Sequence, residues 1–396
     1  MSEAGMSELA ERAAKADADD ALAAKRDLFD LDDGVIYLDG NSLGALPRHV
    51  PARVADVLTR QWGRLRIRGW TEEGWWDAPQ RIGDRIAPLI GAAPGHVVVG
   101  DSTSVNIFRA VVSALRMTPG RNEILVDATT FPTDGYVAAS AARLTGATIR
   151  PVEPKNVPNE VGGDTAVVLL NHVDYRSGRL HDMGALTAAA HAAGARVIWD
   201  LSHSVGALPV DLSGHDVDFA VGCTYKYLNG GPGAPAFFAV RPDLLPELDQ
   251  PLGGWCSHRE PFAMDPDYVA AEGIAKARAG TPEIVSLLTL DASLDVWDDV
   301  DLGRLRAKSL ALTEFFVDCV TELAPAAKSV TPAGEDRGSQ VSLSCVDAEN
   351  VMAELVARGV VGDHRPPDLL RFGFTPLYTR FADALRAAEI LGEILA

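Results

Sequence analysis

The sequence predicts an α/β fold: a large domain built on a mostly parallel sheet, followed by a smaller α+β domain. Between residues 96 and 240, short apolar runs alternate with alanine-rich helical patterns. Near-continuous apolar strands separated by helices are typical of a parallel sheet that is buried on both faces. After about residue 280 the pattern changes to long helices and short alternating strands. A chain of 396 residues has room for both domains.

Each expected element of the large domain follows from its local pattern. Apolar residues at helical spacing predict an amphipathic helix over residues 6–29, which ends before Asp32-Asp33-Gly34. Helical patterns also cover residues 104–117, 134–144 and 182–193. Seven apolar runs predict the seven strands of the sheet: His96–Gly100, Glu123–Ala128, Ala147–Val152, Thr165–Val173, Ala195–Ser202, Phe219–Tyr225 and Ala234–Val240.

The C-terminal part has a different order of elements. The sequence predicts helices over 283–300, 304–323 and 349–358, a final helix from Phe381, and strands over 340–345, 360–364 and 369–374. These changes of pattern divide the chain into an N-terminal helical segment (1–36), a large domain (37–280) and a small domain (281–396).

Composition excludes several classes of partner and site. Lys and Arg number 36 against 55 Asp and Glu, which gives a net charge of −19 and argues against a nucleic-acid or anionic-membrane partner. No apolar run approaches the ~18 residues of a membrane span. The four cysteines form no C-x-x-C pair, so neither a zinc site nor a disulfide scaffold is expected. We expect a cytoplasmic protein without a bound metal.

An acid and a lysine follow two neighbouring predicted strands. Asp200 ends one buried strand, and Lys226 comes just after the next. Sites in such sheets form at the carboxyl ends of strands, so both side chains are expected at the same edge. Beside Tyr225 and Tyr227, a lysine has a low-polarity neighbourhood that favours an amine nucleophile. Pyridoxal phosphate would pair such a lysine with an anion at its ring nitrogen. The alternative is a buried salt bridge between Asp200 and Lys226 without a cofactor.

A phosphate group would need a cradle of donors. Thr103 and Ser104 follow the first predicted strand and begin a helix, where hydroxyls, backbone N–H groups and the helix dipole favour a dianion. The alternative is an ordinary helix cap. Phe131 and Asp134 also follow a strand, and could stack on a pyridine ring and face its hydroxyl region, or simply begin a helix.

Several further residues have two interpretations from the sequence alone. Arg371 ends an apolar strand and suits a carboxylate, because its planar fork binds bidentately, but it could equally lie on the surface. His203 has no ligand spacing around it, so a place beside a ring is a better hypothesis than a metal site. Trp70, with Trp75 and Trp76, belongs either to the core or to an aromatic pocket.

Taken together, these motifs resemble the kynureninase family, which belongs to the fold-type I pyridoxal-phosphate enzymes. The resemblance covers nearly the whole chain from Tyr37 onward, and its ordered set of motifs is highly specific. The motifs are Leu38–Gly44, Phe131–Asp134, Trp199–His203, Tyr225–Asn229, Gly254-Trp255, Ala279–Pro282 and Arg371–Tyr378.

The resemblance implies roles for these residues. Lys226 would form the Schiff base with pyridoxal 5'-phosphate, Asp200 would pair with the ring nitrogen, and Tyr225 would either assist proton transfers or only bind cofactor. Further cofactor contacts would come from Thr103, Ser104, Phe131, Asp134, Asn171, His203, Tyr225, Trp255 and Thr281. The substrate would be bound by Asn41, Ser42, Trp70 and Arg371.

The resemblance also implies an activity and an assembly. The reaction would be hydrolysis of L-kynurenine to anthranilate and L-alanine, in tryptophan degradation. The enzyme would be a homodimer in which Trp255 and Thr281 of one subunit reach the cofactor phosphate bound in the other subunit. Trp70 and Gly280-Thr281 suggest kynurenine rather than 3-hydroxykynurenine. The alternatives are a cysteine desulfurase or selenocysteine lyase, an enzyme for a modified kynurenine, and a cofactor-free binding protein.

Overall fold

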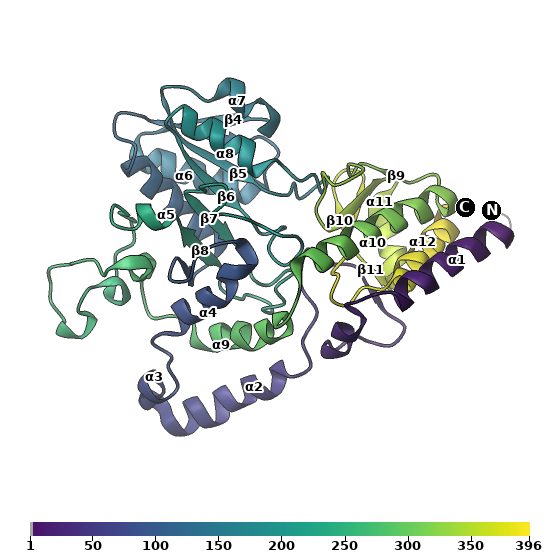
Figure 1. Cartoon of the computed structure of the whole chain (residues 1–396), viewed down its shortest axis with the longest axis horizontal. Coiled ribbons are helices and arrows are strands. Elements are labelled where there is room, and N and C mark those ends of the chain that lie inside the picture. Colours follow the sequence, from purple (N-terminus) through teal and green to yellow (C-terminus); the bar gives the residue numbers. More distant parts are fainter. Residues whose placement is uncertain (1–2) are drawn as a thin grey trace.

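A computed structural model describes residues 3–396 of the chain (Figure 1). The large sheet has seven strands in the order β2-β8-β7-β6-β5-β3-β4. Only β8 runs against its neighbours, so the prediction of a mostly parallel seven-stranded sheet is confirmed. The other six strands therefore end at the same edge. The strands are β2 Val97–Val99, β3 Glu123–Asp127, β4 Thr148–Val152, β5 Thr165–Asn171, β6 Arg196–Asp200, β7 Phe219–Gly222 and β8 Phe237–Val240.

Helices cover both faces of this sheet, which explains why its strands are apolar almost throughout. On one face, α5 (Thr103–Arg116) and α6 (Pro132–Thr145) pack on residues such as Ile198. On the other face, α4 (Ala78–Ile86), α8 (Met183–Ala192) and α9 (Ile284–Ser293) pack on residues such as Val197 and Trp199. Successive strand residues thus point into two different cores. The short helix α7 (Val157–Glu160) follows β4.

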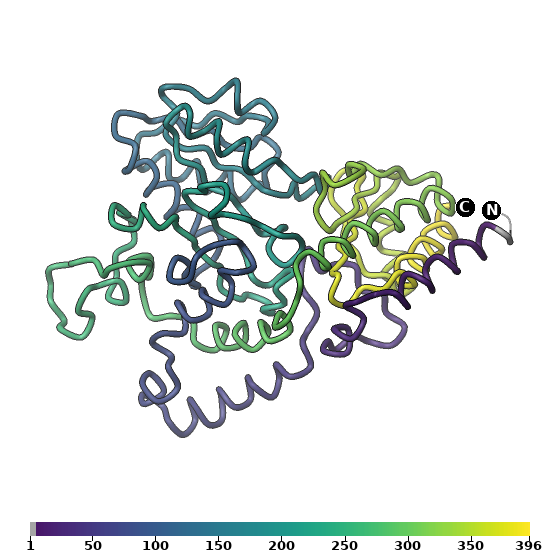
Figure 2. The backbone as a smooth tube through the Cα atoms, viewed as in Figure 1, coloured from purple at the N-terminus to yellow at the C-terminus, as the bar shows by residue number. Residues whose placement is uncertain are grey.

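The small domain has its own antiparallel sheet, in the order β12-β13-β10-β9. Helices α10, α11, α12 and α1 share a core with this sheet, and α1 lies along α12 (Figure 1). The elements are α1 Glu3–Ala18, β9 Lys328–Ser329, β10 Gln340–Ser344, β12 Asp363–Arg365, β13 Leu369–Gly373, α10 Leu302–Leu323, α11 Ala348–Ala357 and α12 Phe381–Leu395. The chain therefore ends beside its own beginning, as the backbone trace shows (Figure 2).

A two-stranded parallel sheet ties the N-terminal part to the small domain. In it β1 (Ile36–Tyr37) pairs with β11 (Val360–Val361). The predicted strand over 360–364 is thus two short strands, which separate at Gly362. The proposed domain boundaries at 36 and 280 stay a prediction, and residues 1 and 2 of the first segment lie outside the described residues. None of the helices within residues 3–396 combines the length and hydropathy needed to cross a membrane.

Other elements differ from the expected ones. The predicted helix over 6–29 ends at Ala18 and is followed by the 3₁₀ turn η1 (Ala23–Leu28). The Asp20 carboxylate accepts the N–H of Leu22 at 2.8 Å and pairs with Lys308 at 2.6 Å, so local side-chain bonds replace the helical ones. The helix expected over 283–300 is α9 followed by η10 (Leu294–Trp297).

Residues 50–90 and 241–283 hold elements that the sequence did not predict. The first stretch contains α2 Val50–Asp56, the π-helix η2 Val57–Leu65, η3 Arg66–Arg68, α3 Gly69–Glu72 and η4 Ala87–Ile90, in addition to α4. The second holds the turns η6 Pro242–Leu244, η7 Trp255–Ser257, η8 Pro261–Ala263 and η9 Gly273–Ala277, and part of it extends away from the large domain (Figure 2). A further turn, η5 (Pro154–Asn156), follows β4.

Candidate active site

The predicted site residues gather at the edge of the large sheet where six strands end. Asn171 and Asp200 are the last residues of β5 and β6 and lie opposite each other in the parallel register. Lys226 follows the end of β7, and Thr103 begins the helix after β2. The alternation of strands and helices is therefore what brings residues from distant parts of the chain to one place.

The side chain of Lys226 is hydrogen-bonded to a buried histidine. Its Nζ atom lies 3.1 Å from Nε2 of His203. Burial lowers the pKa of His203 well below its usual value, and the charges of Lys226 and Arg371 lower it further. The imidazole is therefore neutral, and its Nε2 atom can accept a hydrogen bond from the Lys226 side chain. No ion pair joins Lys226 to Asp200 in the described part of the chain, which argues against a simple buried salt bridge.

Two acids lie together next to this lysine loop. Asp134 accepts hydrogen bonds from Asn171 Nδ2 at 2.8 Å and from Thr130 Oγ1 at 3.0 Å. Burial raises the pKa of Asp134 well above its usual value, and the nearby Asp200 adds to this effect. Asp200 accepts the N–H of Ser202 at 2.7 Å. Neither acid has a salt bridge within residues 3–396, so the pair suits a cationic group such as a protonated pyridine nitrogen.

Phe131 lies at the start of α6, beside these acids. Its ring packs edge-on against Tyr175 with the centroids 5.3 Å apart, and its backbone N–H points toward Asn171 Oδ1 at 3.5 Å. The ring is 43% exposed, which leaves a face that another flat ring can cover. Pro132 occupies the first turn of α6, so the helix start and the site residue are compatible interpretations.

The start of α5 has the donors that a phosphate needs. Ser102 caps the helix through its hydroxyl, which accepts the N–H of Val105 at 3.4 Å. The hydroxyls of Thr103 and Ser104 are half-buried and make no hydrogen bond with any described residue. A 14-residue helix with two uncommitted hydroxyls in its first turn fits a dianion.

Tyr225 connects the lysine loop to the segment around Gly44. Its carbonyl accepts the N–H of Gly44 at 2.8 Å. The neighbouring Cys223 and burial together raise the pKa of the Tyr225 phenol far above its usual value. The phenol therefore stays protonated and can donate a hydrogen bond. Sequence reasoning did not identify Cys223, because nothing in its pattern distinguishes it from a core residue.

Arg371 is deeply buried and already has partners within the chain. Its Nε atom binds Asp363 at 2.8 Å, and Nη2 reaches the second oxygen of the same carboxylate. Nη2 also donates to Ser42 Oγ, and Nη1 donates to the Tyr175 carbonyl, both at 2.9 Å. The surface alternative for Arg371 is thus wrong. Asp363 was missed in the sequence, although it stands opposite Arg371 in the β12–β13 register.

Asn41 lies next to this arginine cluster and is fully buried. Neither its side-chain oxygen nor its side-chain nitrogen finds a partner among the described residues. A buried amide without partners costs free energy, so this side chain is suited to a ligand. The segment 39–44 therefore forms one wall of the site.

Three predicted residues lie in two other places: Trp70 and Trp255 belong to an aromatic cluster, and Thr281 lies at a small cavity. Trp76 packs on Trp70 and Trp255, with ring centroids 6.3 and 5.2 Å apart. Thr281 is exposed and lines a small cavity of about 80 Å³ with Gly100. Among the described residues, no hydrogen bond or ring contact joins Trp70, Trp255 or Thr281 to Lys226.

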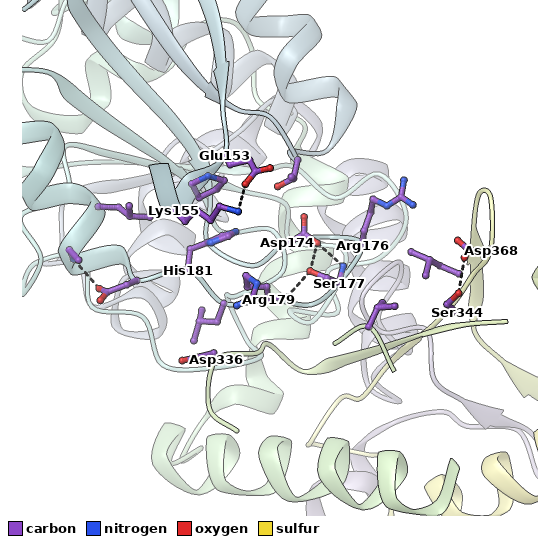
Figure 3. Close-up of a pocket in the computed structure, with 18 residues that line it drawn as sticks. Glu153, Lys155, Asp174, Arg176, Ser177, Arg179, His181, Asp336, Ser344 and Asp368 are labelled. Carbon is purple, nitrogen blue, oxygen red and sulfur yellow. Dashed lines mark hydrogen bonds and ion pairs between the residues drawn. The ribbon is translucent and has the colours of Figure 1, made fainter. Parts of the chain in front are cut away.

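A larger cavity of about 1010 Å³ lies beside the site, between the two domains (Figure 3). Its walls come from the segments after β3, β4 and β5 and from the small domain, and they carry both acidic and basic side chains, such as Asp174, Arg176 and Arg179. Lys226 and Asp200 are not among its lining residues, so it is a neighbouring space. No cluster of metal-ligating side chains was found in the described residues.

Comparison with known proteins identifies the family. A sequence model described as "Kynureninase C-terminal domain" matches residues 305–391. The kynureninase of Deinococcus radiodurans is 51% identical over 388 residues, which is 96% of this chain and 94% of that protein. The kynureninase of Pseudomonas fluorescens is 48% identical over 389 residues, with the same two coverages.

Solved structures support the fold at lower identity. The Escherichia coli cysteine desulfurase CsdA has a TM-score of 0.80 at 20% identity, covering 95% of this chain and 99% of that one. A C-DES variant with glycine covalently linked to its PLP cofactor has a TM-score of 0.79 at 18% identity, covering 91% of this chain and 97% of that one. The structural likeness thus gives the aminotransferase-like fold, and the sequence relatives decide the family. By identity over nearly its full length, the chain belongs to the kynureninase family.

Proposed function

We propose that this chain hydrolyses L-kynurenine to anthranilate and L-alanine, using pyridoxal 5'-phosphate as cofactor. The observation that carries the proposal is the arrangement of Lys226 on a neutral His203, next to an acid pair that has no cation. Membership of the kynureninase family supports the same activity. The reaction adds one water across the bond between the β and γ carbons of the substrate.

The residues present fit the cofactor. Lys226 would hold its aldehyde carbon, Asp200 its ring nitrogen, and Thr103 with Ser104 its phosphate. Phe131 would cover one face of the ring. When bound, pyridoxal phosphate supplies an electrophilic carbon for the substrate amine and a protonated ring that draws electrons from the substrate's α-carbon.

The chain's own groups would handle the protons. Lys226 would be the base for the α-proton, because its Nζ atom lies at the centre of the site and 3.1 Å from Nε2 of His203, which can orient it. Tyr225, which stays protonated, is a donor for a developing negative charge on the substrate. Burial and the nearby Asp200 raise the pKa of Asp134, which favours a neutral Asp134 that bonds to Asn171 and Thr130 beside the charge on Asp200.

The substrate would be oriented by residues 41 and 42 and by Arg371, which line the site across from the ends of the strands. Arg371 and Ser42 present donors for the α-carboxylate, and the unpartnered amide of Asn41 lies beside them. Trp70, with Gly280-Thr281, is proposed to select kynurenine over its 3-hydroxy analogue.

The proposal includes a homodimer in the cytoplasm. Within residues 3–396 no hydrogen bond or ring contact joins Trp255 or Thr281 to Lys226, so we propose that they reach the cofactor phosphate of a partner subunit. Trp62, Ile67 and Phe262 are 61%, 77% and 70% exposed, and an apolar surface of this kind is suited to a second copy.

The direct test is to incubate the purified protein separately with L-kynurenine and 3-hydroxykynurenine and to quantify the aromatic amine and alanine. Equal amounts of anthranilate and alanine are expected from kynurenine. Release of sulfide from L-cysteine without kynurenine turnover would instead indicate a desulfurase. That outcome would contradict the structure, since all four cysteines are buried and burial raises the pKa of Cys345. Turnover of a ring-substituted kynurenine only would point to a biosynthetic variant.

A further inference from the structure

One aspartate in the small domain binds two arginines. Arg371 uses Nε and Nη2 to bind both oxygens of Asp363, and Arg365 Nη2 binds the Oδ2 atom at 2.8 Å. Strand β12 runs antiparallel to β13 and places Asp363 opposite Arg371. Arg365 comes two residues after Asp363, so it points to the same face of the sheet. The two guanidinium groups are therefore held side by side by one shared oxygen.

This cluster has more positive than negative charge near neutral pH. Two arginines face Asp363 and the half-buried Asp39. Burial and the neighbouring Asp363 raise the pKa of Asp39 to about 7, and its buried Oδ1 atom has no partner among the described residues. When Asp39 is protonated, the two positive charges of Arg365 and Arg371 are opposed by the single negative charge of Asp363. The buried Nε atom of Arg365 likewise lacks an acceptor in the described part of the chain. An incoming carboxylate would balance the cluster.

The charge of Arg365 affects His203, the histidine that is hydrogen-bonded to Lys226. Burial, Lys226, Arg371 and Arg365 lower the pKa of His203, in that order. Nε2 of this histidine lies 3.1 Å from the Lys226 amine. Arg365 thus acts on the same space as Arg371. Within residues 3–396, the outer nitrogen atoms of Arg371 bind Ser42 and the Tyr175 carbonyl besides Asp363.

We propose that Arg365 is a second specificity-determining arginine for the substrate's α-carboxylate, and that Asp363 is the positioning residue that aligns Arg365 with Arg371. The inference rests on the proposed function, because that function supplies an α-amino acid as substrate. It adds a charge that recognises the carboxylate independently of the aromatic part of the substrate.

The test is a binding titration that needs no turnover. The holoenzyme is titrated with L-alanine and with L-alaninamide, which lacks the carboxylate, while the visible absorption of the bound cofactor is followed. For Arg365→Gln we expect the L-alanine dissociation constant to rise about tenfold or more, since a charge-assisted contact is lost. The L-alaninamide constant should stay within about twofold of wild type. Arg365→Lys keeps the charge but not the planar guanidinium, so its L-alanine dissociation constant should lie between those of wild type and Arg365→Gln.

Arg179→Gln is the matched control, because Arg179 is exposed and lines the interdomain cavity. It should change neither constant. Equal weakening of both ligands by Arg365→Gln would show a structural role and overturn the inference, as would unchanged L-alanine binding. Asp363→Asn should weaken L-alanine selectively as well, because an amide cannot accept two arginine donors at both of its atoms. If Asp363→Asn instead tightened L-alanine binding, the positioning role would be wrong and the aspartate would act only as a competing charge.

Steady-state kinetics separate this inference from the proposed function. If wild type hydrolyses kynurenine, Arg365→Gln should raise KM about tenfold while kcat changes less than about threefold. If wild type binds L-alanine through Arg365 but does not hydrolyse kynurenine, the inference about Arg365 is supported and the proposed function is wrong. If wild type hydrolyses kynurenine and Arg365→Gln leaves KM unchanged, the reaction stands and the second arginine fails.

Discussion

Gly44 packs directly on the backbone of Lys226. A Cβ atom at position 44 would lie 2.2 Å from the Lys226 carbonyl oxygen and 2.5 Å from the Asn229 side chain. The Gly44 N–H also donates to the Tyr225 carbonyl at 2.8 Å. The segment 39–45 therefore sets the position of the lysine loop, and a glycine is required at the point of closest approach.

Gly44→Ala should displace the lysine loop. We expect a loss of about 1–3 kcal/mol in the free energy of unfolding, because backbone atoms cannot yield to the added methyl group. The measurements are thermal unfolding of the holoenzyme and the kcat for kynurenine. Gly163→Ala is the control, since a Cβ there would meet nothing within 4 Å. Equal stability of the two variants would contradict the close packing at position 44.

Lys226→Ala should abolish turnover, with kcat reduced about 1,000-fold or more, because both the covalent attachment and the base are removed. The visible absorption of the cofactor should change at the same time. Lys276→Ala provides the comparison, as that amine only bonds the carbonyls of Leu245 and Pro246. A variant at 226 that kept more than a tenth of wild-type activity would exclude this lysine as the catalytic amine.

The two acids of the site should respond differently to the same substitution. Burial and Asp200 raise the pKa of Asp134 and favour its neutral form, which Asp134→Asn mimics, so this substitution should lower kcat less than about tenfold. Asp200→Asn removes the negative charge and should lower kcat about 100-fold or more. Both are measured as anthranilate release from holoenzyme with saturating cofactor. The opposite order of effects would mean that Asp134 carries the charge.

The affinity for the substrate should fall as pH rises through about 7. Asp39, with a pKa raised to about 7, loses its proton over that range and then competes with the substrate carboxylate for the positive charge of Arg371 and Arg365. The KM for kynurenine is expected to rise between pH 6 and 8, and Asp39→Asn should flatten that rise. A pH-independent KM in wild type would contradict this assignment.

The same group should affect stability with a defined sign. Its folded-state pKa lies above the model-compound value of 3.8, so its contribution to stability is complete below about pH 4 and is lost as pH rises through about 7. The free energy of unfolding of Asp39→Asn should therefore depend less steeply on pH than that of wild type between pH 4 and 7. Denaturant titrations at several pH values measure the difference.

Most of the sheet-edge site was predictable because it depends on strand order. Asp200 and Lys226 were placed by apolar runs, and parallel strands necessarily bring their carboxyl ends together, whereas Asn171 came from the family resemblance. The family resemblance then supplied proposed roles that residue types alone left open, as for Phe131 and Arg371.

The arginine cluster was not predictable, because it depends on a register in the small sheet. Nothing in the pattern around Asp363 shows that it stands opposite Arg371 or that Ser42 reaches them from the N-terminal part. The break after Ala18 was missed for a similar reason. It depends on Asp20 bonding to Lys308, which is far away in the sequence.

The pairing of Leu38 with two residues of the C-terminal part has a consequence for biosynthesis. Its N–H donates to Val361 at 2.8 Å, and its carbonyl accepts from Gly373 at 2.7 Å. Among the first residues to leave the ribosome, this stretch finds these partners only when translation is nearly finished. Ligand binding should thus be among the last properties that a nascent chain acquires, and a chain stopped before residue 360 should lack it even with its central sheet intact.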